Sequence, residues 1–290
     1  MTGILLVDKP EGFTSHDVIA KLRGVLRERR LGHAGTLDPM ATGLLVVFAG
    51  RATRAVQFAE SQSKRYLAEM RTGIVTDTQD ITGNILETTE MEISEKILCK
   101  LLPEFTGTLL QTPPMYSAVK QNGKKLYELA RKGIEVERKS REITIHSLEY
   151  QGHTENHFQL SIECSKGTYI RTLCHDIGAR LGCGATLSSL RRTNSGDFSV
   201  ENAHTLEEII EFVQQGRAQE LCLPVDSLFS EHAHVAINGK QKEKCLCGNS
   251  FPIDKPDGVY RVYDENGVFL MLAEAREGLM YTIKSFFEIE

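Results

Sequence analysis

Strand-like and helix-like segments alternate irregularly along this sequence, and their order restricts the sheets that the chain can build. Two strand-like segments, REITIHSLEY at 141–150 and HFQLSIECS at 157–165, follow each other with only a polar turn between them. Elsewhere, strands and helices do not follow the regular rhythm of βαβ units. We therefore predict an α+β fold with a mixed, mainly antiparallel sheet and flanking helices.

Capping-box patterns mark the beginnings of two predicted helices. Thr14 and Asp17 precede VIAKLRGVLRERR, which ends at residue 30, and Thr205 and Glu208 open LEEIIEFVQQ. In this pattern the two side chains bond backbone N–H groups that the first helical turn leaves free. Further helices are predicted over 54–58, 94–105 and 169–182, and further strands over 4–10, 44–50, 64–73 and 185–199.

The C-terminal segment changes character from about Ala233. HVAING, VYRVYD, VFLMLAEA and MYTIKSFF are short strand-like runs separated by NG, DG, ENG and EG turns. The segment LPVDSLFSEH joins this region to the rest of the chain. We predict a larger domain over residues 1–231 and a small all-β domain over residues 232–290.

Bulk composition is that of an ordinary globular protein, with 41% hydrophobic and 25% charged residues in a chain of 290. No apolar run reaches the eighteen or so residues that a membrane span needs. The first residues lack the basic start and long apolar core of a secretory signal. The 7 cysteines are odd in number and scattered, which suits reduced thiols. These features predict a cytoplasmic protein without a membrane partner.

Basic residues are concentrated in two segments, although the net charge of the chain is −5. Residues 1–72 hold 11 Lys and Arg against 7 Asp and Glu, and residues 120–141 hold 8 against 3. The acidic excess lies mainly in residues 201–290, with 16 Asp and Glu against 8 Lys and Arg. A local basic surface can bind phosphates on an acidic molecule. Solvated helix surfaces remain the alternative explanation.

The stretch GHAGTLDPMATG, residues 32–43, carries one carboxylate, Asp38, directly before an apolar strand. Pro39 restrains Asp38 to an extended backbone, and the glycines permit tight turning or close approach of a ligand. A simple turn-capping role is the alternative for an isolated Asp-Pro. Two basic stretches, SKGTYIRTL and LRRTNSG, could supply the arginine that a buried carboxylate needs to stay ionised.

Several common kinds of active site are unsupported. No GxxxxGK[ST] or GxGxxG pattern for a nucleotide phosphate occurs. Cys245 and Cys247 have no second pair at zinc-site spacing, so ordinary cysteines are favoured over a metal site there, even with His232 and His234 nearby. Cys174 and His175 are neighbours on a predicted helix and therefore point about 100° apart. We predict no metal and no cofactor.

Six motifs in order make the sequence resemble one known family. They are VDKPEGFTSHD, GHAGTLDPMATGLLVVFAGRATR, KRYLAEMRTG, TPPMYSAVK, SKGTYIRTLCHDIG and LRRTNSG, and together they cover roughly residues 3–200. In these motifs the chain resembles the bacterial tRNA pseudouridine-55 synthases of the TruB type. Those enzymes modify the uridine of the TΨC loop of tRNA.

The resemblance implies a fold, a substrate and a set of site residues. It implies a pseudouridine-synthase catalytic domain over residues 1–231 and a PUA-like RNA-binding domain after it. Asp38 matches the catalytic aspartate, and Lys9 and Pro10 match a motif that supports the site. Five positions match substrate-binding residues of the family. Tyr66 matches the tyrosine that lies against the target base, and Arg171 matches the arginine that pairs with the aspartate. Tyr169 and Leu190 match residues that form the walls of the active site, and His33 matches a histidine near the flipped nucleotide.

The chemistry of this isomerisation agrees with the absence of cofactor motifs. The N1–C1′ bond of uridine breaks, the uracil turns, and C5 bonds to C1′, with no redox change. Flipping the base out of the loop costs a few kcal/mol. Stacking on Tyr66, worth roughly 1–3 kcal/mol, can offset that cost. Attack by Asp38 at C1′, attack at C6 and a glycal route all remain open.

Three rival functions are weighed against this one. A non-catalytic RNA-binding protein or tRNA-folding chaperone of the same fold would not need Asp38 and Arg171, which are both present. A nucleoside hydrolase would have a second carboxylate near Asp38, and the motif holds none. A synthase working inside a guide-RNA complex is disfavoured by the compact chain without long basic tails. We expect a monomer that binds the TΨC stem-loop of tRNA through a mobile basic arm at about 120–141 and requires no protein partner.

Overall fold

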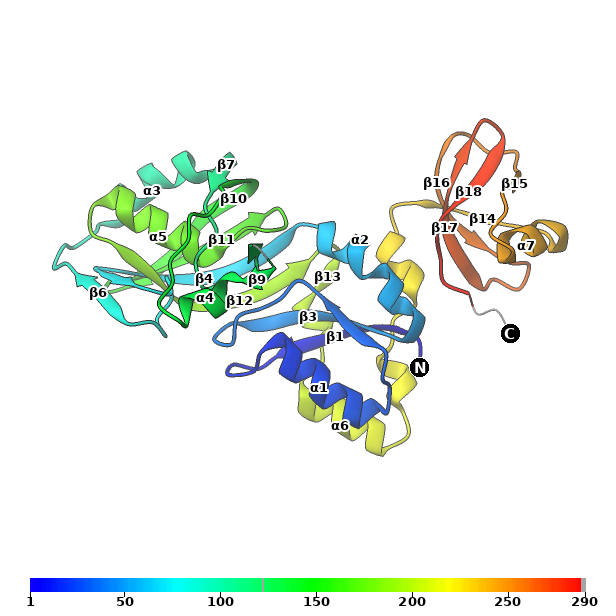
Figure 1. Ribbon diagram of the computed structural model, residues 1–290, viewed down its shortest axis with the longest axis horizontal. Coiled ribbons are helices and arrows are strands. Elements are labelled where there is room, and N and C mark those ends of the chain that lie inside the picture. Colours follow the sequence, from blue (N-terminus) through cyan, green and yellow to red (C-terminus); the bar gives the residue numbers. More distant parts are fainter. Residues whose placement is uncertain (122, 288–290) are drawn as a thin grey trace.

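A nine-stranded sheet runs through the centre of the protein. The computed structural model describes residues 1–121 and 123–287. The sheet has the order β1-β3-β12-β4-β11-β10-β7, with β2 paired to β3 and β13 paired to β12 (Figure 1). The strands are β1 (Gly3–Lys9), β2 (Leu31–Ala34), β3 (Thr42–Ala49), β4 (Lys64–Thr72), β7 (Gly107–Gln111), β10 (Arg141–Thr154), β11 (His157–Cys164), β12 (Ala185–Ser195) and β13 (Phe198–Ser199).

Two antiparallel halves of this sheet meet at one short parallel contact. Strands β1, β2 and β3 form the first half, and the other six strands form the second. Between the halves, Arg191 of β12 lies opposite Thr42 of β3, and Arg192 lies opposite Gly43. We call these two pairs the seam. The predicted mixed, mainly antiparallel sheet is confirmed.

Helices α1 (Ser15–Leu26) and α6 (Leu206–Gln214) both begin at the predicted capping boxes. The Thr14 hydroxyl accepts from the Asp17 N–H at 3.0 Å, and Thr205 accepts from Glu208 at 3.2 Å. Both helices pack their apolar residues on the first half of the sheet. The prediction that α1 continues to residue 30 is wrong, because Arg27 turns into the left-handed region with φ 51° and β2 begins soon after.

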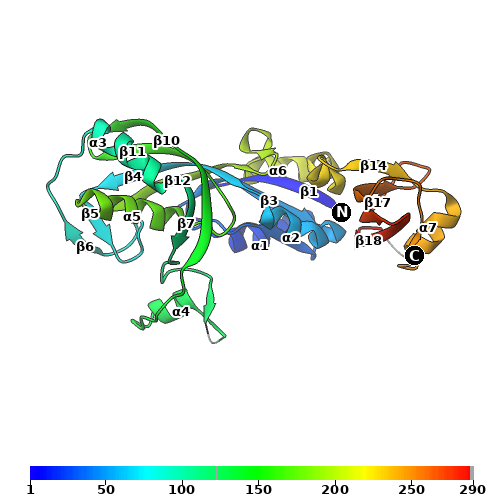
Figure 2. The same cartoon turned by 90° about the horizontal axis from the view of Figure 1, so that it is seen from above.

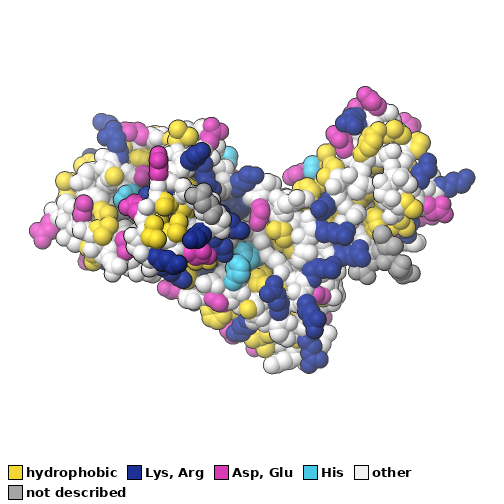
Figure 3. All heavy atoms as spheres, in the orientation of Figure 1, with side chains coloured by type: hydrophobic (Ala, Val, Ile, Leu, Met, Phe, Trp, Pro, Cys, Tyr) yellow, Lys and Arg dark blue, Asp and Glu magenta, His cyan; other side chains and the backbone are white. Residues whose placement is uncertain are grey.

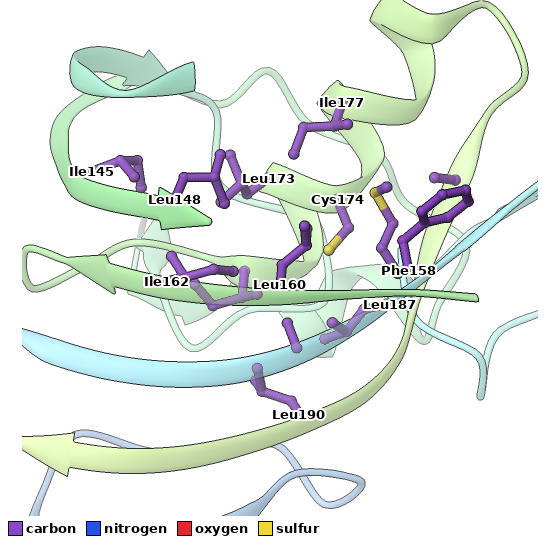
Figure 4. Close-up of a cluster of buried hydrophobic side chains, with 14 of the residues drawn as sticks. Ile145, Leu148, Phe158, Leu160, Ile162, Leu173, Cys174, Ile177, Leu187 and Leu190 are labelled. Atoms are coloured by element: carbon purple, nitrogen blue, oxygen red, sulfur yellow. The ribbon is translucent and has the colours of Figure 1, made fainter. Parts of the chain in front are cut away.

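Helix α5 (Ile170–Leu181) covers the second half of the sheet and ends at Gly182, as predicted. Its buried side chains meet those of β10, β11 and β12 in a continuous core (Figure 4). Because the same helix carries Arg171 in its first turn, this packing fixes the position of the guanidinium. Core members include Ile145, Leu148, Phe158, Leu160, Leu173, Ile177 and Leu187.

Shorter elements complete the larger part of the chain. They are the helices α2 (Val56–Ser61) and α3 (Glu95–Leu101), the hairpin β5 (Ile74–Thr76) with β6 (Ile85–Thr88), and the 3-10 turns Gly50–Ala55, Leu102–Phe105, Val200–Asn202, Ala218–Leu221 and Val225–Phe229. Helix α3 and the 3-10 turn after it occupy the predicted helical segment 94–105. Across the described residues, no helix combines the length and apolar character needed to cross a membrane.

The basic segment forms an arm between β7 and β10 that projects away from the sheet (Figure 2). It contains the strands β8 (Lys120–Gln121) and β9 (Lys124–Lys125) and the helix α4 (Leu126–Ala130). Two hydrogen bonds hold its base. The Thr112 and Ser140 hydroxyls are 2.8 Å apart, and Arg138 Nη1 donates to the Pro113 carbonyl oxygen at 3.1 Å.

A separate five-stranded sheet forms the C-terminal region in the order β14-β16-β17-β18-β15. Its strands are β14 (Ala233–Ala236), β15 (Phe251–Pro252), β16 (Gly258–Tyr263), β17 (Phe269–Arg276) and β18 (Leu279–Ser285). The predicted β-rich region is present, but it also contains the helix α7 (Gly239–Leu246). Asn238 and Gly239 do not form the predicted turn between strands, because the Asn238 side chain caps α7 by accepting from the Gln241 N–H at 3.0 Å.

An aromatic cluster joins the C-terminal sheet to the larger part of the chain. The ring of Phe229 lies 5.3 Å from Phe58, 6.3 Å from Phe269 and 5.9 Å from Phe286, measured between centroids. Arg54 adds a hydrogen bond to the Ser285 carbonyl oxygen at 3.1 Å. Burial of large aromatic surfaces dominates the energy of such packing. The two parts are therefore packed together rather than only tethered.

Candidate active site

Asp38 lies on the loop that joins β2 to β3. Its neighbour Leu37 is buried, and the Leu37 N–H donates to the Ser15 hydroxyl at 2.9 Å. On the other side, the Lys9 ammonium donates to the Pro39 carbonyl oxygen at 3.3 Å. The loop is thus held on both sides of Asp38, whose side chain remains 36% exposed. The carboxylate is fixed in place and still open to a ligand.

Arg171 reaches Asp38 from the first turn of α5. Its Nε atom is 2.9 Å from Oδ2 of Asp38, and its Nη2 atom donates to Oδ1 at 3.3 Å. The guanidinium also donates to the carbonyl oxygens of Thr78 at 2.9 Å and Tyr116 at 2.8 Å. Its side chain is only 4% exposed. Nη2 makes the hydrogen bond and Nε adds a close charge contact, so the guanidinium fixes both the charge and the orientation of the carboxylate.

Asp80 is a second carboxylate at this site, although the Asp38 motif itself holds none and no second one was predicted. Its Oδ2 atom lies 3.4 Å from Arg171 Nη1. Its Oδ1 atom accepts from the Thr78 hydroxyl at 2.8 Å and from the Thr82 hydroxyl at 2.6 Å. Because these donors occupy its oxygens, Asp80 orients Arg171 and does not offer a free acid or base.

Burial and neighbouring charges act in opposite directions on Asp38. Burial of the carboxyl group raises the pKa of Asp38 above its ordinary value, and the negative charge of Asp80 adds to this rise. Arg171, and more weakly Lys9, lower the same pKa. A raised carboxylate pKa makes the group a better base when it is ionised. Arg171 keeps the ionised form available.

Tyr66 and Leu190 lie together beside the Asp38 loop. Tyr66 comes from β4 and Leu190 from β12, and both belong to the apolar cluster that contains Leu37 and Ala41 of the loop. Tyr66 is half-buried, and burial raises the pKa of its hydroxyl. The phenol ring is therefore neutral at physiological pH and offers an apolar face next to the loop.

Tyr169 stands at the N-cap of α5, two residues before Arg171. The buried side chain of Gln111 holds its backbone: the Tyr169 N–H donates to Gln111 Oε1 at 2.8 Å, and Gln111 Nε2 donates to the Tyr169 carbonyl oxygen at 3.0 Å. Gln111 ends β7, where the arm begins. Gln111 was not predicted, because a glutamine at a strand end carries no recognisable sequence signal.

His33 lies on β2, at the start of the Asp38 loop. Its ring is 5.6 Å from the ring of His16 in an edge-to-face arrangement. Burial lowers the pKa of His33 to about 4, and the charges of His16 and Arg192 act in the same direction. His33 is therefore a neutral imidazole at physiological pH. Its Nδ1 atom is buried and bonds to no other described residue.

Besides Arg171, three more Lys and Arg side chains are buried around the Asp38 loop. Lys9 and Arg192 are 0% and 1% exposed, and Lys64 is 5% exposed. Burial lowers the pKa of both lysines to about 8. All three donate hydrogen bonds to backbone carbonyl oxygens. Figure 3 shows further Lys and Arg side chains gathered over the middle of one face of the molecule.

Within residues 1–121 and 123–287, no group of three or more His, Cys, Asp or Glu side chains is arranged to hold a metal ion. Cys245 lies on α7 with its side chain buried, its Sγ 3.4 Å from the Met271 sulfur, and Cys247 is exposed. Of the predicted site residues, Asp38 and Arg171 are in direct contact. Tyr66 and Leu190 belong to one apolar cluster. Tyr169 precedes Arg171 by two residues at the start of α5, and His33 lies on β2, just before the Asp38 loop.

Comparison with known proteins identifies the class to which this fold and site belong. A profile described as "TruB family pseudouridylate synthase (N terminal domain)" matches residues 23–170. A second, described as "tRNA pseudouridylate synthase B C-terminal domain", matches residues 171–230. The chain therefore belongs to the TruB family of pseudouridylate synthases. The boundary between the two profiles falls within the nine-stranded sheet, because β12 belongs to the second.

Curated relatives and solved structures agree with this family. The protein named tRNA pseudouridine synthase B from Clostridium kluyveri is 39% identical to this chain, and the match covers 99% of this chain and 100% of the relative. The protein of the same name from Bacillus cereus is 43% identical, and the match covers 94% of this chain and 92% of the relative. An H/ACA RNP bound to a substrate RNA contains a chain of similar fold, with a TM-score of 0.75 at 23% identity, covering 99% of this chain and 85% of that one. A Cbf5-Nop10-Gar1 complex matches with a TM-score of 0.74 at 25% identity, covering 98% and 85%.

Proposed function

We propose that this chain isomerises the uridine at position 55 in the TΨC loop of tRNA to pseudouridine. The observation that carries the proposal is the forked ion pair between Arg171 and Asp38, open on one side beside the Tyr66 ring. The relatives named tRNA pseudouridine synthase B support the choice of tRNA. A chaperone that only folds RNA would have no use for a carboxylate held and charged in this way.

The site residues have distinct roles in this proposal. The uridine leaves the base stack and lies against Tyr66, with Leu190 and Tyr169 as walls and His33 near the nucleotide. Asp38 acts as nucleophile or base while Arg171 keeps it ionised and oriented. The N1–C1′ bond breaks and the C5–C1′ bond forms. The proton on C5 passes to solvent and N1 gains one, so no oxidant, reductant or hydrolysis is involved.

The release of the C5 proton gives a direct test. Purified protein alone is incubated with an unmodified TΨC stem-loop carrying tritium at C5 of its uridines, and tritium released to water is counted. Release from the loop uridine in proportion to carbodiimide-resistant pseudouridine is expected. A loop with cytidine at the target position is the control. The proposal includes that the protein acts in the cytoplasm as a monomer and needs no protein partner. If protein that folds and binds RNA released no tritium, the proposed activity without a partner would be contradicted.

The arm at about 120–141 is proposed to bind RNA phosphates. Lys124, Arg131 and Lys132 are exposed, and the charges of Lys125 and Arg131 lie 5.4 Å from the Tyr127 ring centre. Changing Lys124, Lys125, Arg131 and Lys132 to Ala should weaken binding for any loop sequence. The slope of log K against log salt concentration should flatten by about 0.7–0.9 for each phosphate that the arm no longer neutralises.

The matched control for the arm is the exposed pair Lys96 and Lys100 on α3, changed to Ala. Binding titrations over a range of salt concentrations compare the two variants. An unchanged slope in the arm variant would mean that these residues are only a solvated surface.

The division into domains at residues 231 and 232 is also a proposal. A chain ending at Glu231 keeps the whole nine-stranded sheet and all the site residues. We expect it to fold, to keep the single-turnover rate at saturating RNA, and to bind tRNA about tenfold more weakly, or about 1.4 kcal/mol. Its thermal stability should fall, because Phe229 loses its aromatic neighbours Phe269 and Phe286.

Full-length protein with Phe229→Ala separates the two effects of that truncation. It weakens the aromatic cluster and retains the C-terminal sheet. Single-turnover assays and binding titrations on both variants give the comparison. Normal RNA binding with lost isomerisation in the truncated chain would place the C-terminal sheet in the active site and contradict the division.

A further inference from the structure

Arg192 is a buried cation at the point where the two halves of the sheet meet. Its side chain is 1% exposed. In the seam it lies opposite Gly43 of β3, and on its other side it lies opposite Tyr66 of β4. No carboxylate forms an ion pair with it anywhere in the part of the chain that the structure describes. Burying a charge without a counter-ion is costly, so an apolar residue would serve a purely packing role better.

The guanidinium instead joins the Asp38 loop to the strand that follows it. Its Nε atom donates to the Leu44 carbonyl oxygen at 2.7 Å, and its Nη2 atom donates to the Gly35 carbonyl oxygen at 3.0 Å. Gly35 and Leu44 lie on either side of Asp38. One planar group therefore holds the loop where it leaves β2 and, beyond Asp38, where it has joined β3.

Two glycines let the loop lie directly against Arg192. A Cβ atom on Gly35 would come within 3.1 Å of Arg192 Nη1, and one on Gly43 would come within 2.3 Å of the Arg192 carbonyl oxygen. Both glycines also have positive φ, at 73° and 96°. The loop is packed on this residue through both its backbone and its side chain.

Tyr66 is the neighbour of Arg192 on the adjacent strand β4. Residues directly opposite in an antiparallel pair have their Cβ atoms roughly 5 Å apart on the same face. The charge of Arg192 also lowers the pKa of Tyr66 against the stronger effect of burial. Arg192 thus contacts the Asp38 loop on one side and faces the proposed base-stacking residue on the other.

We propose that Arg192 is a positioning residue that sets the spacing between the Asp38 loop and Tyr66, and with it the gap that receives the flipped uridine. This rests on the proposed isomerisation of uridine. Because Arg192 is buried, we do not expect it to contact the RNA. Its loss should therefore change the chemical step and leave RNA affinity nearly unchanged.

The decisive variant is Arg192→Met, which keeps an unbranched apolar side chain in place of the arginine stem and removes the guanidinium without burying an unpaired charge. A displacement of about 1 Å can lower a rate about 100-fold, so we expect a single-turnover rate at saturating RNA reduced by about that factor. The dissociation constant for the stem-loop should change by less than about threefold. Arg192→Lys keeps the charge but cannot bridge both carbonyl groups, so we expect partial rescue to roughly tenfold below wild type.

Arg191→Met is the matched control. Arg191 is the next residue on the same strand, its side chain is 40% exposed, and it pairs with Asp8 at 2.7 Å instead of with the loop. Its rate should stay close to that of wild type. Gly35→Ala would place a methyl group against the same guanidinium from the loop side. Its effect on the rate should be non-additive with that of Arg192→Met, since both changes disturb the contact between Arg192 and the loop.

Amide hydrogen exchange at residues 35–41 gives a readout that does not depend on activity. Exchange should be faster in Arg192→Met than in wild type or Arg191→Met. Wild-type protein without isomerase activity would contradict the proposed function. Active wild type with an equally active, folded Arg192→Met would overturn only this inference. If Arg192→Met does not fold, Arg192→Lys decides, and a rate within about threefold of wild type overturns the inference.

Discussion

Asp38→Asn should abolish isomerisation while RNA binding persists. Asparagine keeps the shape of the side chain and most of its hydrogen bonds, but it removes the negative charge that the nucleophile or base requires. Loss of an activated nucleophile lowers turnover by roughly 10⁴- to 10⁶-fold, and we expect a loss in this range. Single-turnover tritium release and a binding titration measure the two effects separately.

Asp8→Asn is the control for that change. Asp8 lies on β1 and pairs with Arg191, so it is also a carboxylate in an ion pair, but it does not contact Arg171. This variant should keep its activity. Mass spectrometry of the Asp38→Asn protein must exclude deamidation back to aspartate. Substantial turnover by protein that is free of deamidation would remove Asp38 from the catalytic role.

Arg171→Met should produce the second largest loss. The guanidinium pairs with Asp38 and Asp80, so its removal leaves two carboxylates facing each other. Loss of one preorganised electrostatic partner lowers a rate about 10²- to 10³-fold. Breaking a buried ion pair costs about 3–5 kcal/mol of stability, and we expect the lower end because Asp38 is partly exposed.

The pH dependence distinguishes this electrostatic role from a structural one. Arg171 lowers the pKa of Asp38, so its removal raises that pKa further. Since the ionised carboxylate is the active form, activity is lost as pH falls through the pKa of Asp38. The acid limb of the rate profile should therefore move to higher pH in Arg171→Met. A variant with the wild-type profile would show that Arg171 only supports the fold.

Local patterns were sufficient to predict most of the elements. The Thr14 and Thr205 capping boxes and the apolar runs of β3 and β11 depend on neighbours in sequence, and the structure contains them. The end of α1 was missed because Arg27 is an ordinary helix former. Only the pairing of β2 with β3 draws the chain out of the helix there. The sequence predicts a turn at Asn238 although the residue caps a helix, because the same side chain suits both.

Family motifs supplied Asp38, Arg171 and the other predicted site residues, but Asp80 and Gln111 take part only through long-range contacts. Asp80 lies in a loop that resembles any polar turn, and its pairing with the distant residue Leu187 brings it to Arg171. The reciprocal bonds of Gln111 with Tyr169 join residues 58 positions apart. No periodicity or spacing encodes such contacts, because each one depends on the packing of the whole sheet.

The seam has a consequence for the order of folding. Asp38 and Arg171 are 133 positions apart in the chain, and Arg192 and Leu44 are 148 apart. Each half of the sheet can form antiparallel pairs within itself, whereas the seam closes a longer loop than any antiparallel strand pair of this sheet and does so for only two residue pairs. Contacts that close long loops form late, because the chain loses conformational entropy on closing the loop before the favourable contacts can offset that loss. We therefore expect activity to appear only in the last kinetic phase of refolding, after most of the secondary structure has been recovered.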